Sequence, residues 1–225
     1  MATVNNQIPL DLKAPVSFDM ADFIVSDSNN EAVEFISRWQ GWSHHFVALV
    51  GPRACGKSHL LHGWAADVGA EFIEPDVDIA AMKPAGFYVL DDVNQKDECG
   101  NLLYDDVALF HLYNWLSEIG ATLLVTAEDA PTLWPRVLPD LKSRLGTVPV
   151  AAITEPDDNL LIMLLVKLFS DRQLEVNIDV IHYILKHIER SFSAVHKLVE
   201  TVDKDALARR RKVTKALVRE CLNYQ

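Results

Sequence analysis

Hydrophobic residues in the first two thirds of the chain fall into short, nearly unbroken runs, with longer stretches of helical spacing between them. The runs cover residues 46–50, 87–90, 122–126 and 147–153. Helical spacing covers 57–68, which ends at Gly69, and 105–119, which ends at Gly120, and glycine often closes a helix. Apolar runs that alternate with helices predict an α/β domain with a mostly parallel sheet.

After Thr154 the pattern changes to helical spacing throughout, with no strand-like run between the helices. The helical stretches are residues 157–171, about 178–189, 192–208 and 214–222. We therefore expect an α/β domain at 18–154 and a small helical domain at 155–225. Residues 1–17 show no sustained period and are interpreted as an extended tail.

A loop bounded by glycines joins the first apolar run to the first helical stretch. Its sequence, Gly51-Pro-Arg-Ala-Cys-Gly56-Lys57-Ser58, fits the pattern G-x-x-x-x-G-K-[ST] between a strand and a helix. The backbone N–H groups of such a loop and the helix N-terminus attract phosphate. Lys57 is expected to neutralise the outer phosphates, and Ser58 to offer its hydroxyl to Mg²⁺. The nucleotide-binding segment predicted here comprises Gly51, Pro52, Arg53, Ala54, Cys55, Gly56, Lys57, Ser58 and His59.

Two carboxylates, Asp91 and Asp92, directly follow the apolar run at 87–90. Ligands of open α/β sheets bind at the carboxyl ends of the strands. Asp91 is therefore expected to hold Mg²⁺ through water, and Asp92 to orient a water molecule. The alternative is that the pair caps the N-terminus of a helix.

Composition narrows the classes of protein that fit this pattern. The net charge of -11 argues against strong binding to duplex DNA, and the basic run at 209–212 is interpreted as a solvated helix edge. Cys55, Cys99 and Cys221 lack metal-ligand spacing, which favours a reducing, cytoplasmic compartment. The longest apolar stretch, 160–166, is too short to cross a membrane. We therefore expect a soluble cytoplasmic protein with no membrane partner.

Phe18 and residues 23–29 precede the first predicted strand. They look like the box that opens the AAA+ domain of the bacterial replication initiator DnaA, and the resemblance to this family covers roughly residues 18–222. In the family this box packs around adenine, so the resemblance implies adenine contacts for Phe23, Ile24 and Val25.

Later segments continue the resemblance. Residues 90–93 are similar to the Walker B motif of the family, and residues 124–131 to its sensor-1 stretch. The second match implies that Glu128 lies near the γ-phosphate. Residues 141–145 resemble the box that carries an arginine finger, which implies that role for Arg144.

The final stretch, 211–222, looks like the last lid helix of the short regulatory members of this family, the Hda type, which inactivate DnaA. Those members carry a peptide near the N-terminus that binds the sliding clamp of the DNA polymerase, and residues 7–12 are similar to it. The clamp contacts implied by this match are Gln7, Leu10, Asp11 and Leu12. An extended peptide of this kind offers hydrogen bonds and apolar side chains to a pocket.

One position departs from the family pattern. Alignment of residues 198–203 with the family places His196 where the lid normally has its sensor-2 arginine. A neutral imidazole is a poor substitute for a guanidinium clamp on phosphates. Either His196 or Arg190 could fill the role, and the protein's own ATP hydrolysis is expected to be weak.

The resemblance implies a negative regulator of replication initiation, acting in the bacterial cytoplasm near the nucleoid and the replisome. It would bind ADP or ATP with Mg²⁺, dock on the sliding clamp and insert Arg144 into the nucleotide site of ATP-bound DnaA. One alternative is an AAA+ accessory or loader protein that recruits replication factors without stimulating hydrolysis. A second alternative is a small-molecule P-loop kinase. Such kinases usually begin within a few residues of the first strand, whereas about forty-five residues precede it here, which argues against this alternative. The choice between ADP and ATP stays open, as does homotypic or heterotypic assembly.

Overall fold

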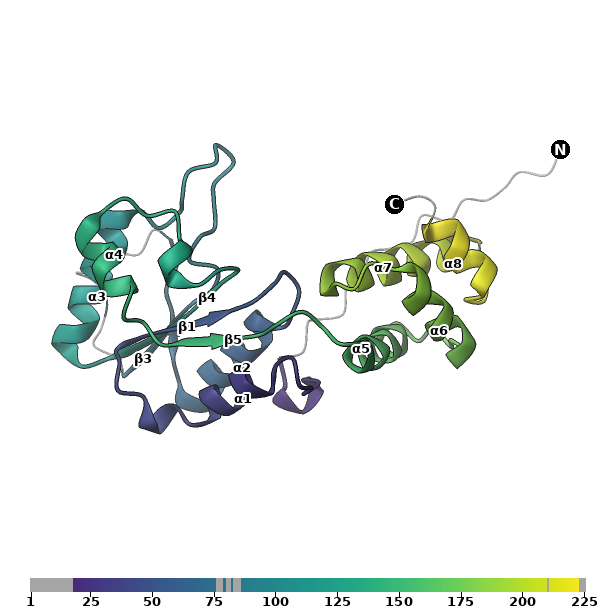
Figure 1. Ribbon diagram of the computed structural model, residues 1–225, viewed down its shortest axis with the longest axis horizontal. Coiled ribbons are helices and arrows are strands. Elements are labelled where there is room, and N and C mark those ends of the chain that lie inside the picture. Colours follow the sequence, from purple (N-terminus) through teal and green to yellow (C-terminus); the bar gives the residue numbers. More distant parts are fainter. Residues whose placement is uncertain (1–17, 76–78, 80–81, 83–85, 210, 223–225) are drawn as a thin grey trace. The chain divides into compact units, whose positions relative to one another are not determined.

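The computed structural model describes residues 18–75, 79, 82, 86–209 and 211–222 (Figure 1). Within these residues the chain divides after Thr154 into two compact units, which are described separately. The tail residues Gln7, Leu10, Asp11 and Leu12 lie outside the described residues.

The first unit is built on a five-stranded sheet in which every pairing is parallel. Its strands, in spatial order, are β2 (Glu71–Phe72), β3 (Phe87–Leu90), β4 (Thr122–Ala127), β1 (Phe46–Val50) and β5 (Val150–Ala152). All five residues of β1 are buried, as expected of a central parallel strand covered on both faces. The α/β class predicted from the sequence is confirmed.

Two pairs of helices cover the two faces of this sheet (Figure 1). The pairs are α3 (Asp106–Ile119) with α4 (Pro139–Leu145), and α1 (Asn30–Ser37) with α2 (Lys57–Val68). The α3–α4 side forms one apolar cluster with alternate residues of the strands, among them Phe46 and Val125. Helix α1 packs on β5, and α2 packs on β3 and β4. The carboxyl ends of β1, β3 and β4 are thus held at one edge of a rigid three-layer core.

Several sequence expectations needed correction in this unit. The helix placed at 105–119 begins at Asp106, because the Asp105 side chain caps it by accepting from Ala108 N. The strand placed at 147–153 shortens to Val150–Ala152. The reason is that the amides of Thr147 and Val148 bond back to the last turn of α4, which removes them from the sheet.

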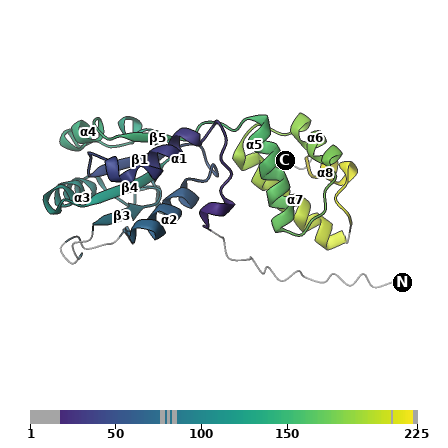
Figure 2. The same ribbon diagram turned by 90° about the horizontal axis from the view of Figure 1, so that it is seen from below.

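The second unit, described from 155 to 222, is helical. It consists of α5 (Asp158–Asp171), α6 (Ile178–His187), α7 (Phe192–Arg209) and α8 (Lys215–Leu222). Helix α5 packs on α6 and α7, and α8 packs on α6 and α7 (Figure 2). Its separate apolar core includes Leu165, Ile184, Leu198 and Val218. None of the helices in the described part of the chain is long and apolar enough to cross a membrane.

Candidate nucleotide site and arginine finger

The phosphate loop connects β1 to α2 and depends on two glycines that sit close to other parts of the chain. Gly51 has φ +157°, and a Cβ there would lie 2.7 Å from the carbonyl oxygen of Ile153. Gly56 has φ +96°, and a Cβ there would lie 2.7 Å from the ring of Phe23. A side chain at Gly51 would therefore clash with the backbone of Ile153, and one at Gly56 would displace either the Phe23 ring or the loop.

The side chain of Lys57 folds back so that its ammonium group lies against the backbone of the loop. Its Nζ donates to the carbonyl oxygens of Gly51 and Pro52, each at 2.8 Å. Gly56, which precedes α2, has no side chain to cap the helix, so the first N–H groups of α2 face outward together with this ammonium. The concave backbone and the positive charge fit a nucleotide phosphate.

Asp91 and Asp92 lie at the carboxyl end of β3, beside β4. The hydroxyl of Thr126 on β4 donates to Asp91 Oδ1 and accepts from the backbone N–H of Asp92 at 2.8 Å. Thr126 is only 1% exposed, so this contact fixes the direction of the Asp91 carboxylate. The alternative that the two aspartates cap a helix is wrong, since the next described helix, α3, is capped by Asp105.

The donor set at this edge fits Mg²⁺ shared with a nucleotide. Ser58 and Asp91 offer hard oxygen donors, which Mg²⁺ prefers. Within the described residues no group of three or more His, Cys, Asp or Glu side chains is arranged as a metal cage. Mg²⁺ commonly takes one or two ligands from protein and its other oxygens from phosphates and water.

Glu128 meets the phosphate loop through an ion pair. The Arg53 Nε donates to Glu128 Oε1, which joins the loop to the end of β4. Both side chains are well exposed, so the pair is screened by salt and adds little stability. The structure therefore brings Glu128 to the mouth of the loop, with Arg53 beside it.

Asp92 lies in the same acidic corner. The surrounding protein removes part of its water although the side chain stays exposed, and this raises the pKa of Asp92 above its ordinary value. The charges of Asp91 and Glu128 raise this pKa further, and the charge of Lys57 partly opposes them.

The segment expected to meet adenine lies against the start of α2. Phe23 rests on Gly56, and its ring centroid lies 5.4 Å from that of His59. His59 Nε2 is 2.7 Å from the Asp19 carbonyl oxygen, which ties the helix to the segment before it. The carbonyl of Ile24 accepts from Asn29 Nδ2, whereas Val25 is 50% exposed.

Arg144 lies on α4 and rests on two aromatic rings of α3. Its guanidinium carbon is 5.0 Å from the ring centroid of Phe110 and 5.1 Å from that of Tyr113. Among the described residues no carboxylate forms an ion pair with Arg144. The side chain is half-buried, so the rings hold its position while its charge is left without a counter-ion in that part of the chain.

The lid contains both candidates for the sensor-2 role. Burial lowers the pKa of His196 below its ordinary value, and the nearby charge of Arg172 lowers it further. Arg190 is engaged in two hydrogen bonds to the carboxylate of Asp158, at 2.8 and 3.0 Å. Sequence reasoning missed Arg172, which is brought close to His196 only by the packing of α5 on α7.

The sheet order, the phosphate loop after β1, the carboxylates after β3 and the helical unit together define a AAA+ P-loop domain with a lid. The family model described as "Hda, lid domain" matches residues 158–222. Domain III of DnaA from Thermotoga maritima superposes with a TM-score of 0.74 at 15% identity, over 93% of this chain and 98% of that one. Residues 158–222 thus match the lid of the Hda family, and the fold of the chain is that of domain III of DnaA.

Two other solved structures show the same fold. The AMPPCP-bound DnaA of Aquifex aeolicus has a TM-score of 0.65 at 19% identity and covers 89% of this chain and 69% of that one. The Holliday junction branch migration motor RuvB of Thermotoga maritima has a TM-score of 0.67 at 15% identity, over 92% of this chain and 72% of that one.

Proposed function

We propose that this protein is a DnaA-related regulator of replication initiation that lowers the amount of ATP-bound DnaA. It binds ADP or ATP with Mg²⁺, attaches to the sliding clamp through Gln7, Leu10, Asp11 and Leu12, and supplies Arg144 to the nucleotide site of DnaA. The observation that carries the proposal is the guanidinium of Arg144, held on Phe110 and Tyr113 without a carboxylate partner among the described residues.

The nucleotide of this protein would bind at the phosphate loop. The loop from Gly51 to Ser58 would hold its phosphates, Asp91 and Ser58 would hold Mg²⁺, and Phe23 would contact the base. Support comes from the fit of the loop backbone to an anion and from solved DnaA structures of this fold that contain AMPPCP. Mg²⁺ would supply positive charge between the outer phosphates.

Arg144 would act on DnaA by electrostatics. A guanidinium placed beside a phosphoryl group in transfer stabilises the charge of the transition state, and in other proteins such a finger contributes about 10³–10⁵ in rate. Because Phe110 and Tyr113 already restrict the side chain, less conformational entropy is lost when it enters a partner site.

Hydrolysis within this protein is expected to be slow. Asp92 reaches less far toward a water molecule than a glutamate would. His196 is kept neutral near pH 7 by burial and by Arg172, so it offers no full positive charge to a phosphate.

The central test measures ATP hydrolysis by DnaA in the presence of this protein, ADP and the clamp on DNA. Arg144→Ala should still fold, with a lower melting temperature because two ring contacts are lost, should keep its ADP affinity, and should reduce stimulation by at least ~10³-fold. Lys142→Ala, an exposed change on the same helix, is the matched control and should keep full stimulation. Undiminished stimulation by Arg144→Ala would refute the role of the finger.

The two alternatives make different predictions in the same experiment. An accessory or loader protein would bind DnaA or another replication factor without raising the hydrolysis rate, whichever residue occupies position 144. A small-molecule kinase would transfer phosphate from ATP to a nucleoside in the absence of DnaA.

A further inference from the structure

Arg136 has a fully buried side chain, although the segment around it lies at the surface. The exposed fraction of the Arg136 side chain is 0%. Its neighbours alternate, since Trp134 is 4% exposed whereas Leu133 and Val137 are 70% and 82% exposed. A charged side chain pointing inward between apolar ones pointing outward reverses the usual preference, so it needs a specific explanation.

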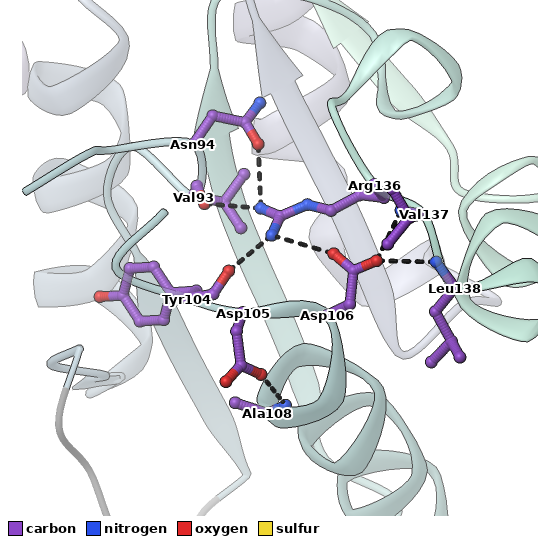
Figure 3. A network of polar contacts seen from close by, with 9 residues as sticks. All are labelled: Val93, Asn94, Tyr104, Asp105, Asp106, Ala108, Arg136, Val137 and Leu138. Carbon is purple, nitrogen blue, oxygen red and sulfur yellow. Dashed lines mark hydrogen bonds and ion pairs between the residues drawn. The ribbon is translucent and has the colours of Figure 1, made fainter. Parts of the chain in front are cut away.

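The guanidinium of Arg136 joins three separate stretches of chain (Figure 3). Its Nη2 donates to the carbonyl of Val93 at 2.8 Å and to Asn94 Oδ1 at 2.9 Å, and its Nη1 donates to the carbonyl of Tyr104. Nη1 also lies 3.7 Å from Asp106 Oδ1. Burial lowers the pKa of Arg136 and the charge of Asp106 opposes that effect, so the buried charge is tolerated because these acceptors surround it.

Asp106 extends the network to the start of α4. Its Oδ2 accepts from the backbone N–H groups of Val137 and Leu138, at 2.6 and 2.8 Å, and Pro139 then begins α4. Burial would raise the pKa of Asp106, but these two bonds and the Arg136 charge outweigh it and leave the pKa below its ordinary value. Asp106 therefore remains a carboxylate that holds the entry of α4.

The other end of the network reaches the nucleotide site. Val93 and Asn94 directly follow Asp91 and Asp92. The Val93 amide donates to the carbonyl of Thr126 at 3.0 Å, and the hydroxyl of Thr126 contacts Asp91. Hydrogen bonds thus link Asp91 to Arg136. The ion pair of Arg136 with Asp106 then extends the link to the residues before α4.

We propose that Arg136 is a positioning residue for Arg144. Arg136 fixes the start of α4, the helix that carries Arg144, to the segment after Asp91 and Asp92. The inference rests on the proposed function of Arg144. Helix α4 has only seven residues, too few to be stable alone, so its position depends on the burial of Leu141 and Leu145 and on what fixes the residues before its first turn. A lysine at 136 could not replace the fork that reaches Val93, Asn94 and Tyr104 at once.

The first test separates positioning from folding. Arg136→Lys should still unfold cooperatively, but the amides of residues 137, 138 and 140–145 should exchange hydrogen at least ~10-fold faster than in the unchanged protein. Exchange in α2 and in the lid should not change. Arg38→Lys, a change at an arginine whose side chain is 78% exposed, is the control and should alter neither region.

The second test uses DnaA hydrolysis. Arg136→Lys should lower the maximal stimulated rate by about tenfold, with little change in the concentration that gives half of it or in ADP affinity. In a protein that already carries Arg144→Lys, the change Arg136→Lys should cause no further loss of stimulation, because Arg136 would act only through the guanidinium of Arg144.

Two outcomes would overturn the proposal: unchanged exchange of residues 137, 138 and 140–145 in folded Arg136→Lys, or additive losses in the double variant. If Arg136→Lys fails to fold, Asp106→Asn applies the same tests to the bonds at Val137 and Leu138. If the Arg144→Ala variant stimulates ATP hydrolysis by DnaA as well as the unchanged protein does, the proposed function fails. The hydrogen-exchange measurement still decides whether Arg136 holds α4.

Discussion

Thr126 places a hydroxyl inside the sheet, where it serves both aspartates of the β3 end. The bond that it donates to Asp91 and the one that it accepts from Asp92 N–H replace water that cannot reach this point. A buried group that loses its partner keeps its full desolvation penalty. The direction of the Asp91 carboxylate therefore depends on a residue from the neighbouring strand.

Thr126→Val is nearly isosteric and removes only this hydroxyl. Stability should fall by about 1–3 kcal/mol, and Mg²⁺-dependent ADP affinity should fall about tenfold because Asp91 loses its orientation. Denaturant unfolding and calorimetric titration with ADP, with and without Mg²⁺, measure the two effects. Thr122→Val, at the other end of the same strand, should leave the affinity unchanged. Equal affinities for both variants would contradict the role of Thr126.

Local motifs made the phosphate loop, Asp91 and Asp92 site candidates, and the family resemblance added Glu128, because each lies in a short segment with a recognisable order. Thr126, Arg136 and Arg172 were missed for the opposite reason. Arg136, for example, bonds to residues that are 32 to 43 positions away, and nothing in its immediate neighbours indicates that the side chain turns inward.

At the level of elements, the sequence best predicted the helices that have many residues of helical spacing and a clear end signal. Helix α2 ends at Gly69 and α3 at Gly120, both in the left-handed conformation, as expected. Helices α1 and α4 were missed since they have eight and seven residues, which carry too few turns for a clear period.

Helix α7 carries a titratable group whose protonation opposes folding. The pKa of His196 is lowered from 6.5 in the folded protein, so below about pH 6.5 the unfolded chain binds more protons than the folded one. The stabilising contribution of neutral His196 to the free energy of unfolding is therefore fully present above pH 6.5. It is lost as the pH falls toward the pKa of His196 in the folded protein.

We expect the unfolding midpoint in denaturant to decline between pH 7 and pH 5.5 more steeply for the unchanged protein than for His196→Gln. NMR titration of the imidazole should give a pKa below 6.5. His182→Gln, at an exposed position on α6, is the matched control and should follow the unchanged protein. Identical pH profiles for all three proteins would show that His196 is not desolvated as described.

At the scale of the whole molecule, the predicted α/β class and the family resemblance were confirmed by the sheet order, the Hda lid match and the DnaA-like fold. The clamp contact at residues 7–12 remains a prediction, because these residues lie outside the described chain. In the proposed function this tail delivers the protein to DNA, since a net charge of -11 disfavours direct binding to duplex DNA.

The double change Gln7→Ala and Leu10→Ala should reduce clamp affinity by at least ~100-fold in a surface-binding assay with the full chain. ADP affinity and melting temperature should stay the same, because the phosphate loop and both apolar cores lie elsewhere. Asn5→Ala with Asn6→Ala, in the same tail, should retain the affinity. Clamp binding that survives the first double change would favour the accessory or loader alternative.

The contact between Phe23 and Gly56 has a mechanical consequence. A side chain at Gly56 would meet the Phe23 ring, so it would press on the segment that follows the tail as well as on the phosphate loop. In the proposed function that tail binds the clamp, and a substitution at Gly56 would then be felt at the nucleotide and on the clamp-binding side of the chain together.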